Sequence, residues 1–355
     1  MVTMLLLTLI GAIAVRSASR PALVSAGLDP NVFVKRQLIF FCIAMVLFLA
    51  TTIFDYRQGR AVAPLAYAAG VVLLIVVLTP LVEATKGAQR WIEIGVFRIQ
   101  PSELMKVVVI VALSAFLARE RMGHGLTEVA VALGIVLFPA ILVYLQPDLG
   151  TMMVFVAILF AILLAAGVQM RWLLAVILIG TVSFALAVQF GVLKEYQVAR
   201  LTAFLDSEPD ERSAGYNLAQ SKIAIGSGGF SGKGLLKGTQ TNLKYVPEQH
   251  TDFVFTAIGE ETGFIGAILI LSLFSFLLWR CLRIAMLSKD LFGTLLAVGI
   301  GMMFAFQIFV NIGMTIGIMP ITGIPLPFVS YGGSSLITNY VAVGLLMNVH
   351  MRRFL

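Results

Sequence analysis

The sequence predicts an all-α polytopic membrane protein with ten transmembrane helices and one long extracytoplasmic loop between helices 7 and 8. Three observations predict this class. Of the 355 residues, 59% are apolar, whereas soluble domains are about 45–50% apolar. Charged residues make up 12%, about half of the soluble norm. Apolar runs of roughly span length recur along the chain. The net charge of +7 is small and dispersed, which argues against a nucleic-acid-binding protein.

Each expected span is an apolar run with little or no charge, and backbone groups in lipid must bond within their own segment, so these runs predict helices. The alternating pattern of a membrane β-barrel is absent. The first run ends at Arg16 and is short for a span, which suggests that part of the natural N-terminus is missing. The runs cover residues 1–15, 37–54, 61–80, 99–117, 129–145, 151–167, 172–190, 253–278, 291–312 and 331–349.

The distribution of basic residues predicts the orientation. With ten spans, both termini lie on one side with the connections 55–60, 118–128, 168–171 and 279–290, and these segments with the tail 350–355 hold ten Lys and Arg in 39 residues. The short loops of the opposite side hold seven in 62 residues. The denser side is expected to be cytoplasmic, which places both termini inside. Ten of the twelve prolines lie in or beside the outward loops, which favours an outward-facing cavity.

The long outer loop, about residues 191–252, is polar and rich in glycine, and a loop of this length is usually functional or disordered. An interfacial helix is expected at 216–230. The glycine stretch 226–234 matches neither GxxxxGK[ST] nor GxGxxG. A flexible loop is the expected state, with an anion-binding nest beside Lys233 and Lys237 as the alternative. Cys42 and Cys281 show no metal or redox spacing and are expected to be packing residues.

Acidic residues at the edge of an apolar run are functional candidates, because burying their charge is costly. Glu103 and Lys106 open the fourth span three residues apart, so they share one helix face and can pair. A helix cap with a neutralised lysine and a site role are both open for this pair. Asp148 lies in the outer turn before the sixth span, where capping of that helix is favoured over catalysis.

Asp252 is the strongest candidate for catalysis. It is the last carboxylate before the apolar residues of the eighth span, where partial desolvation should raise its proton affinity and suit it to be a general base. A helix N-cap is the alternative, and Thr251 competes for that position. His250 is the rival base. Glu260 and Glu261 lie two turns deeper, where at least one must face the protein interior.

At these residues the sequence resembles the SEDS family (shape, elongation, division and sporulation) of bacterial cell-wall synthesis. The resemblance extends over most of the chain in an ordered series of segments. Its last two segments resemble the elongation branch of the family more than the division branch. The segments are GAQRWIEIGVFRIQPSELMK (87–106), QPDLGT (146–151), AIGSGGFSGKGLLKGTQTNLKYVPEQHTDFVF (224–255) and GIMPITGIPLPFVSYGGSSL (317–336).

The resemblance implies a single SEDS-type transmembrane domain over 1–355 in the bacterial cytoplasmic (inner) membrane. It also implies peptidoglycan glycosyltransferase activity that polymerises lipid II, the undecaprenyl-diphosphate-linked disaccharide-pentapeptide, at the outer leaflet. A class B penicillin-binding protein is the implied partner. The family's essential aspartate corresponds to Asp252, and the substrate-binding or supporting candidates are Glu103, Lys106, Arg90, Trp91, Asp148, Lys233, His250, Ser330 and Tyr331.

An inverting glycosyl transfer from a diphosphate needs a base for the attacking hydroxyl and positive charge for the leaving group. Asp252 is the expected base, and Lys106, Arg90 or Lys233 would stabilise the pyrophosphate. A divalent cation, magnesium or manganese, could assist, although no aspartate–aspartate motif is visible. Two alternatives remain: a lipid II flippase or transporter, and a non-catalytic scaffold of the wall-synthesis complex. The candidate groups cluster at one outer face instead of the midplane, which favours interfacial chemistry over transport.

Overall fold

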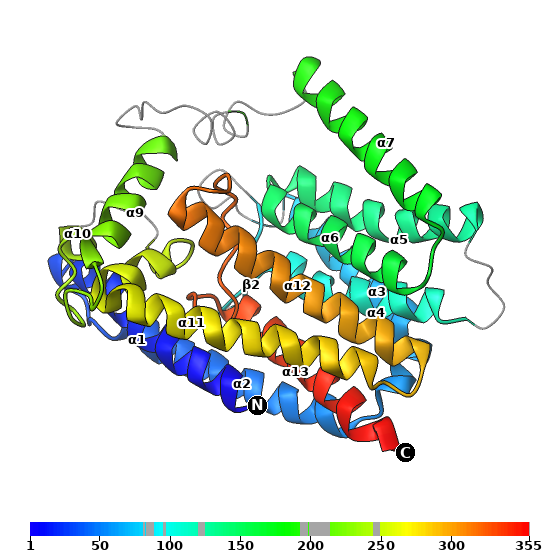
Figure 1. Ribbon diagram of the computed structural model, residues 1–355, viewed down its shortest axis with the longest axis horizontal. Helices are drawn as coiled ribbons and strands as arrows, with labels where there is room; N and C mark the ends of the chain where they lie inside the picture. The colour runs from blue at the N-terminus through cyan, green and yellow to red at the C-terminus, as the bar shows by residue number, and fades with distance from the viewer. Residues whose placement is uncertain are drawn as a thin grey trace. The chain divides into compact units, whose positions relative to one another are not determined.

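The structure is a computed structural model and describes residues 1–80, 82, 89–94, 97–119, 125–191, 198, 214–243 and 249–354. Almost all of its regular structure is helical (Figure 1). The helices are α1 (Val2–Ser25), α2 (Val32–Ile53), η1 (Tyr56–Gln58), α3 (Gly59–Leu78), α4 (Pro101–Leu117), α5 (Leu126–Leu145), α6 (Leu149–Ala165), α7 (Met170–Gln189), α9 (Ala214–Gly228), α10 (Thr239–Leu243), α11 (Val254–Met286), α12 (Leu291–Ile316), α13 (Gly333–Met351) and η2 (Arg352–Phe354).

Every apolar run that predicted a span contains a helix, but several boundaries differ. The expected end of the first helix at residue 15 is wrong, because α1 continues through Pro21 to Ser25. Arg16 and Arg20 both lie on its exposed face, where a long cationic side chain can extend to polar surroundings without ending the helix. The eighth expected span ends at residue 278, whereas α11 continues to Met286.

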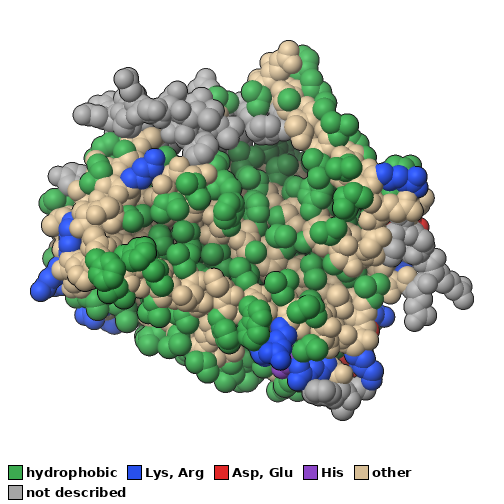
Figure 2. Space-filling view, in the orientation of Figure 1, with side chains coloured by type: hydrophobic (Ala, Val, Ile, Leu, Met, Phe, Trp, Pro, Cys, Tyr) green, Lys and Arg blue, Asp and Glu red, His purple; other side chains and the backbone are tan. Residues whose placement is uncertain are grey.

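Among the described residues, six helices are long and apolar enough to cross a membrane by length and composition: α1, α2, α3 together with η1, α5, α11 and α12. Two shorter apolar helices cover Leu149–Ala165 and Met170–Ser183. Large hydrophobic side chains are exposed along these helices, and hydrophobic groups cover much of the visible surface in Figure 2. The six qualifying helices indicate an integral membrane protein, and the count of ten spans stays a prediction.

The chain divides into two compact units. Unit 1 comprises residues 1–39, 185–277 and 307–332, and unit 2 comprises residues 40–184, 278–306 and 333–355. In unit 2, α4 packs against α3, α5, α6 and α13. The side chains of α4 that face these helices, such as Val109, Ile110 and Leu113, are fully buried.

Unit 2 also contains an antiparallel pair of strands, β1 (Ile92–Ile94) and β2 (Phe97–Ile99), in the register Ile92 with Ile99 and Glu93 with Arg98. The cross-strand pair Glu93–Arg98 forms a salt bridge with an Nε–Oε1 distance of 2.8 Å. These strands occupy the start of the expected fourth span, so that helix begins at Pro101 and not at residue 99. Proline suits the first turn of a helix because it lacks the N–H that would be unpaired there.

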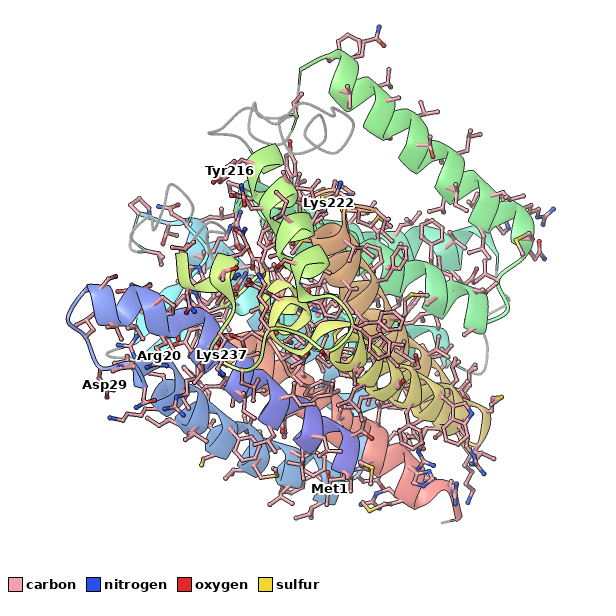
Figure 3. All side chains as sticks on the ribbon, turned by 60° about the vertical axis from the view of Figure 1, so that its left-hand side comes forward. Met1, Arg20, Asp29, Tyr216, Lys222 and Lys237 are labelled. Atoms are coloured by element: carbon pink, nitrogen blue, oxygen red, sulfur yellow. The ribbon has the colours of Figure 1, made fainter. Side chains whose placement is uncertain are left out.

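In unit 1, a buried cluster of Leu218, Phe253, Met314 and Ile321 joins α9, α12 and the segments that flank α11 and α12. Beside it, the Ser221 hydroxyl lies 2.5 Å from the Thr256 hydroxyl and donates to the Thr315 carbonyl at 2.8 Å. A helix is present in the segment where one was expected at 216–230: it is α9, which carries Tyr216 and Lys222 (Figure 3), and its interfacial position stays a prediction.

Candidate functional site

Asp252 lies in a turn immediately before α11 and is half-buried. Asn311, fully buried on α12, donates from one amide nitrogen to the Asp252 carbonyl at 2.9 Å and to the Ile324 carbonyl at 2.7 Å. Gly323 has a φ of +74°, and a Cβ built on it would lie 3.3 Å from Asp252 Oδ2. The loop 317–332 thus presents a glycine to the candidate base, while Asn311 ties both main chains to α12.

His250, Ser330 and Tyr331 lie in the same part of unit 1. The Tyr331 N–H donates to the His250 carbonyl at 3.0 Å, and the Ser330 hydroxyl accepts from the Leu326 N–H at 2.9 Å. The Phe33 ring lies 4.8 Å from the His250 ring and 4.9 Å from the Tyr331 ring between centroids. His250 therefore sits in an aromatic cluster, and Ser330 closes the turn of the loop.

Lys233 also belongs to unit 1, where its Nζ lies 2.9 Å from Oε1 of the fully buried Glu260. Glu260 additionally accepts the N–H groups of Gln240 and Thr241 at 2.8 and 2.9 Å and the Thr241 hydroxyl at 2.7 Å. The Thr239 hydroxyl donates as well, at 3.2 Å, and a buried carboxylate with five donors is fully compensated. Glu260 thereby fixes α10, and Lys233 is engaged in this network.

The glycine stretch 226–234 is packed against α11, so the expectation of a flexible loop was wrong for these residues. α11 is interrupted at Gly263, which has a φ of +63° and a ψ of −157°. There the N–H groups of Lys233 and Gly234 donate to the carbonyls of Glu260 and Glu261 at 3.1 and 3.0 Å. The Phe264 N–H returns a bond to the Gly229 carbonyl at 3.0 Å. The N–H groups of Lys233 and Gly234 are thus already bonded to carbonyls. They therefore do not form part of an anion-binding nest.

Glu103 and Lys106 form the expected pair, with an Oε1–Nζ distance of 2.8 Å at the start of α4 in unit 2. The two residues are 3% and 1% exposed. Glu103 Oε2 is buried and has no hydrogen-bond partner among the described residues. A buried ion pair with one oxygen unsatisfied is costly for stability alone.

Asp148 caps α6, as the sequence favoured: its carboxylate accepts the Thr151 N–H at 3.2 Å and the Thr151 hydroxyl at 2.9 Å. Gln100 also donates to Asp148, at 3.1 Å. Arg90 donates from Nε to the Gln146 carbonyl at 2.8 Å and from its terminal nitrogen to the Pro147 carbonyl. Trp91 is half-buried beside it. Arg90 and Asp148 therefore hold one turn, in which Pro147 has a φ of +31°.

The structure thus gathers Asp252, His250, Ser330 and Tyr331 in unit 1 and places Glu103, Lys106, Arg90 and Asp148 in unit 2. Sequence reasoning missed Asn311, because a lone asparagine within an apolar helix carries no motif. Its one signal is that a polar amide in a span must find partners in the protein. Over the described residues, no group of three or more His, Cys, Asp or Glu side chains could hold a metal ion.

These features define a class: a nearly all-helical integral membrane protein with carboxylates at helix starts. A family model described as "Cell cycle protein", for FtsW, RodA and SpoVE, matches residues 1–354. The chain is 37% identical over 319 residues to "Peptidoglycan glycosyltransferase MrdB" of Escherichia coli (strain K12), covering 90% of this chain and 86% of that protein. It is 40% identical over 354 residues to "Stage V sporulation protein E" of Bacillus subtilis (strain 168), covering 98% and 94%.

Solved structures superpose on nearly the whole of this chain. One, described as "Structural coordination of polymerization and crosslinking by a peptidoglycan synthase complex", has a chain that superposes with a TM-score of 0.79 at 30% identity, covering 99% of this chain and 97% of that one. The rod-shape-determining protein RodA of Thermus thermophilus superposes with a TM-score of 0.73 at 28% identity, covering 99% and 96%. The chain belongs to the FtsW/RodA/SpoVE family, which is the SEDS family.

Proposed function

We propose that this chain is a peptidoglycan glycosyltransferase that polymerises lipid II at the outer face of the bacterial cytoplasmic membrane during cell elongation. The relative from E. coli carries the name of this activity, and the match covers 90% of this chain and 86% of that protein. The basic inner connections support an orientation with both termini in the cytoplasm. The long loop and the turn with Asp252 then face outward, where a lipid-linked disaccharide exposes its head group.

Asp252 acts as the general base in this proposal. It removes the proton from the 4-hydroxyl of the acceptor sugar, whose oxygen attacks the anomeric carbon of the donor with inversion and releases undecaprenyl pyrophosphate. The observation that carries this role is the glycine opposite the carboxylate. Gly323 has a φ of +74° and Asn311 holds the Asp252 main chain, so the carboxylate is carried on a fixed backbone and no side chain of residue 323 covers it.

The leaving pyrophosphate needs positive charge, and the three cationic candidates differ in their partners. Arg90 donates to two carbonyls, and Lys233 is bound to Glu260, which accepts from four further donors, so both have structural roles. Among the described residues, Lys106 Nζ donates to one atom, Glu103 Oε1, in a pair that stability alone does not explain. Lys106 is therefore the best-supported candidate. The described carboxylates and histidines form no cation-binding cluster.

A class B penicillin-binding protein is the proposed partner and would supply the transpeptidase. The solved complex that superposes on this chain is described as one that coordinates polymerisation and crosslinking. An enzyme that makes glycan strands needs such a crosslinking activity beside it, which supports the pairing.

Polymerisation of labelled lipid II by the purified full chain with its partner tests the proposal. We expect glycan chains from the wild type and a loss of at least about a hundredfold in rate for Asp252→Asn, because general-base catalysis contributes about 10²–10⁴-fold. Asp29→Asn is the matched control, since Asp29 is an exposed carboxylate of the same unit paired with Lys35 at 2.6 Å. Equal chain formation by Asp252→Asn and the wild type would overturn the role of Asp252.

The same preparation distinguishes a polymerase from the two alternatives, a lipid II flippase and a non-catalytic scaffold. In vesicles with fluorescent lipid II, a flippase moves the lipid between leaflets without making chains, and a scaffold does neither. The buried Glu103–Lys106 pair is the observation that favours transport. Transbilayer movement by the wild type without chain formation would replace the polymerase assignment with the flippase.

A further inference from the structure

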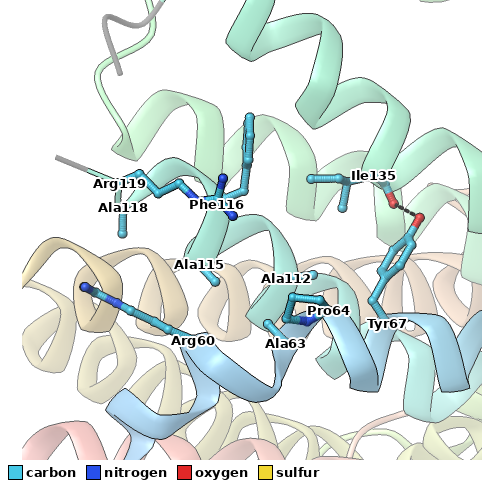
Figure 4. Close-up of a pocket in the computed structure, with 10 residues that line it drawn as sticks. All are labelled: Arg60, Ala63, Pro64, Tyr67, Ala112, Ala115, Phe116, Ala118, Arg119 and Ile135. Atoms are coloured by element: carbon cyan, nitrogen blue, oxygen red, sulfur yellow. Dashed lines mark hydrogen bonds between the residues drawn. The ribbon is translucent and has the colours of Figure 1, made fainter. Parts of the chain in front are cut away.

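A pocket of about 740 Å³ lies in unit 2, between the first half of α3 and the last half of α4, with Ile135 of α5 at its far end (Figure 4). Its volume is within the range of about 300–1,000 Å³ that is common for small-molecule sites. None of its lining residues belongs to the candidate sites described above. The pocket is at the end of α4 opposite to Glu103 and Lys106.

The walls of this pocket are apolar, and small side chains create its space: Ala63, Pro64, Ala112, Ala115 and Ala118. At the end formed by Tyr67 and Ile135, the Tyr67 hydroxyl donates to the Ile135 carbonyl at 2.9 Å, so that polar group already has a partner. Seven residues separate Arg60 from Tyr67, which corresponds to about 10 Å along the helix. An apolar wall of this length suits contact with a hydrocarbon chain.

The other end of the pocket carries positive charge. Arg60 of α3 and Arg119, which follows α4, lie at this end, away from Tyr67 (Figure 4). Asp290 Oδ2 lies 3.9 Å from Arg60 Nη2 and 3.7 Å from Arg57 Nε. Both distances are too long for direct hydrogen bonds. The guanidinium of Arg119 lies 5.7 Å from the centre of the Phe116 ring. The arginines therefore keep N–H donors in the fork geometry that binds phosphate oxygens.

We propose that this pocket binds one anionic phospholipid, with its phosphate at Arg60 and Arg119 and an acyl chain along the alanine wall toward Tyr67. Charge complementarity selects the anionic head group. The apolar walls select an amphiphile over a soluble phosphate, which would leave these walls in contact with water. With the proposed orientation, this end of the helices faces the cytoplasmic leaflet, where anionic lipids attract basic residues at helix ends.

Native mass spectrometry of the purified full chain tests the site by titration with phosphatidylglycerol and with phosphatidylcholine of the same acyl chains. We expect tighter binding of phosphatidylglycerol to the wild type and a loss on the order of tenfold in the Arg60→Gln/Arg119→Gln variant. Arg171→Gln/Arg283→Gln removes the same charge from two other exposed positions of unit 2 and should bind like the wild type. Equal binding by the two double variants would overturn the proposal.

A second variant tests the walls without changing charge. Ala115→Leu fills the pocket and should weaken phosphatidylglycerol binding, whereas Ala130→Leu adds the same volume on the exposed face of α5 and should not. Inorganic phosphate at millimolar concentration should fail to displace the lipid, and displacement would instead assign a soluble-anion site.

Melting temperatures in detergent show that each variant is folded, and Arg119→Gln alone is the exposed substitution to use if the double variant unfolds. Lipid binding is read out without polymerisation, so its failure leaves the proposed activity untouched.

Discussion

Asn311 is the residue through which α12 controls the position of the candidate base. Replacing it by leucine removes this donor from the half-buried carbonyl of Asp252 and the buried carbonyl of Ile324, and a buried group left unsatisfied costs about 1–3 kcal/mol. We expect Asn311→Leu to lower kcat for polymerisation by at least tenfold with a smaller change in KM, because the base is displaced while the substrate contacts remain. Steady-state polymerisation kinetics check this.

The control for Asn311 is another buried asparagine that performs the same structural task elsewhere. Asn348 on α13 donates to the carbonyls of Thr51 and Thr52 at 2.9 and 3.1 Å in unit 2. Asn348→Leu should lower the melting temperature by a similar amount and leave kcat per folded molecule close to the wild-type value. A parallel loss of kcat in both variants would show that Asn311 acts through stability alone.

The Glu103–Lys106 pair allows stability and function to be separated. Lys106→Met leaves Glu103 buried and unpaired, and breaking a buried ion pair in this way costs about 3–5 kcal/mol. The double variant Glu103→Gln/Lys106→Met removes both charges and should recover most of the melting temperature. We expect polymerisation to remain lost in the double variant, because Lys106 no longer meets the pyrophosphate. Recovered activity would reduce the pair to a structural role.

At the scale of elements, the interruption of α11 at Gly263 and the glycine stretch 226–234 are joined by main-chain hydrogen bonds. Gly263 has a φ of +63°, and a Cβ there would lie 2.9 Å from the Gly229 carbonyl oxygen. Gly263→Ala should therefore destabilise the protein by at least about 1 kcal/mol. Gly134→Ala, in α5 with open space at its Cβ, should be neutral or slightly stabilising. Thermal unfolding in detergent compares the two variants, and equal melting temperatures would contradict this account.

The same elements show what sequence could and could not predict locally. Apolar length predicted a helix in each of the ten expected spans, but the fourth was expected from residue 99, whereas β2 occupies that position and α4 begins at Pro101. The glycines of 226–234 predicted a flexible loop because composition reports only backbone freedom. What uses that freedom is a close approach to carbonyls about 30 residues later in the chain, and no local pattern contains that partner.

For the whole molecule, the sequence predicted the class, the family and the pairing of Glu103 with Lys106, since each depends on spacing or on an ordered series of segments. It did not predict that Lys233 is held by Glu260, or that Arg90 fixes the turn before α6. Both depend on contacts between segments far apart in the chain. Charged residues near a candidate site can therefore be found from sequence, whereas their division into structural and chemical roles requires the fold.

The orientation of the whole chain rests on ten Lys and Arg in 39 inner residues against seven in 62 outer residues, and labelling can test it. The protein has two cysteines, Cys42 and Cys281, which are replaced by serine to give the background. In intact cells, a membrane-impermeant maleimide should label Asp29→Cys, in the expected outer loop, and should not label Lys289→Cys, in an expected inner connection. After lysis both should react, which controls for accessibility. The reverse pattern would invert the topology and move the Asp252 turn to the cytoplasmic face, where a lipid II polymerase could not deliver strands to the wall.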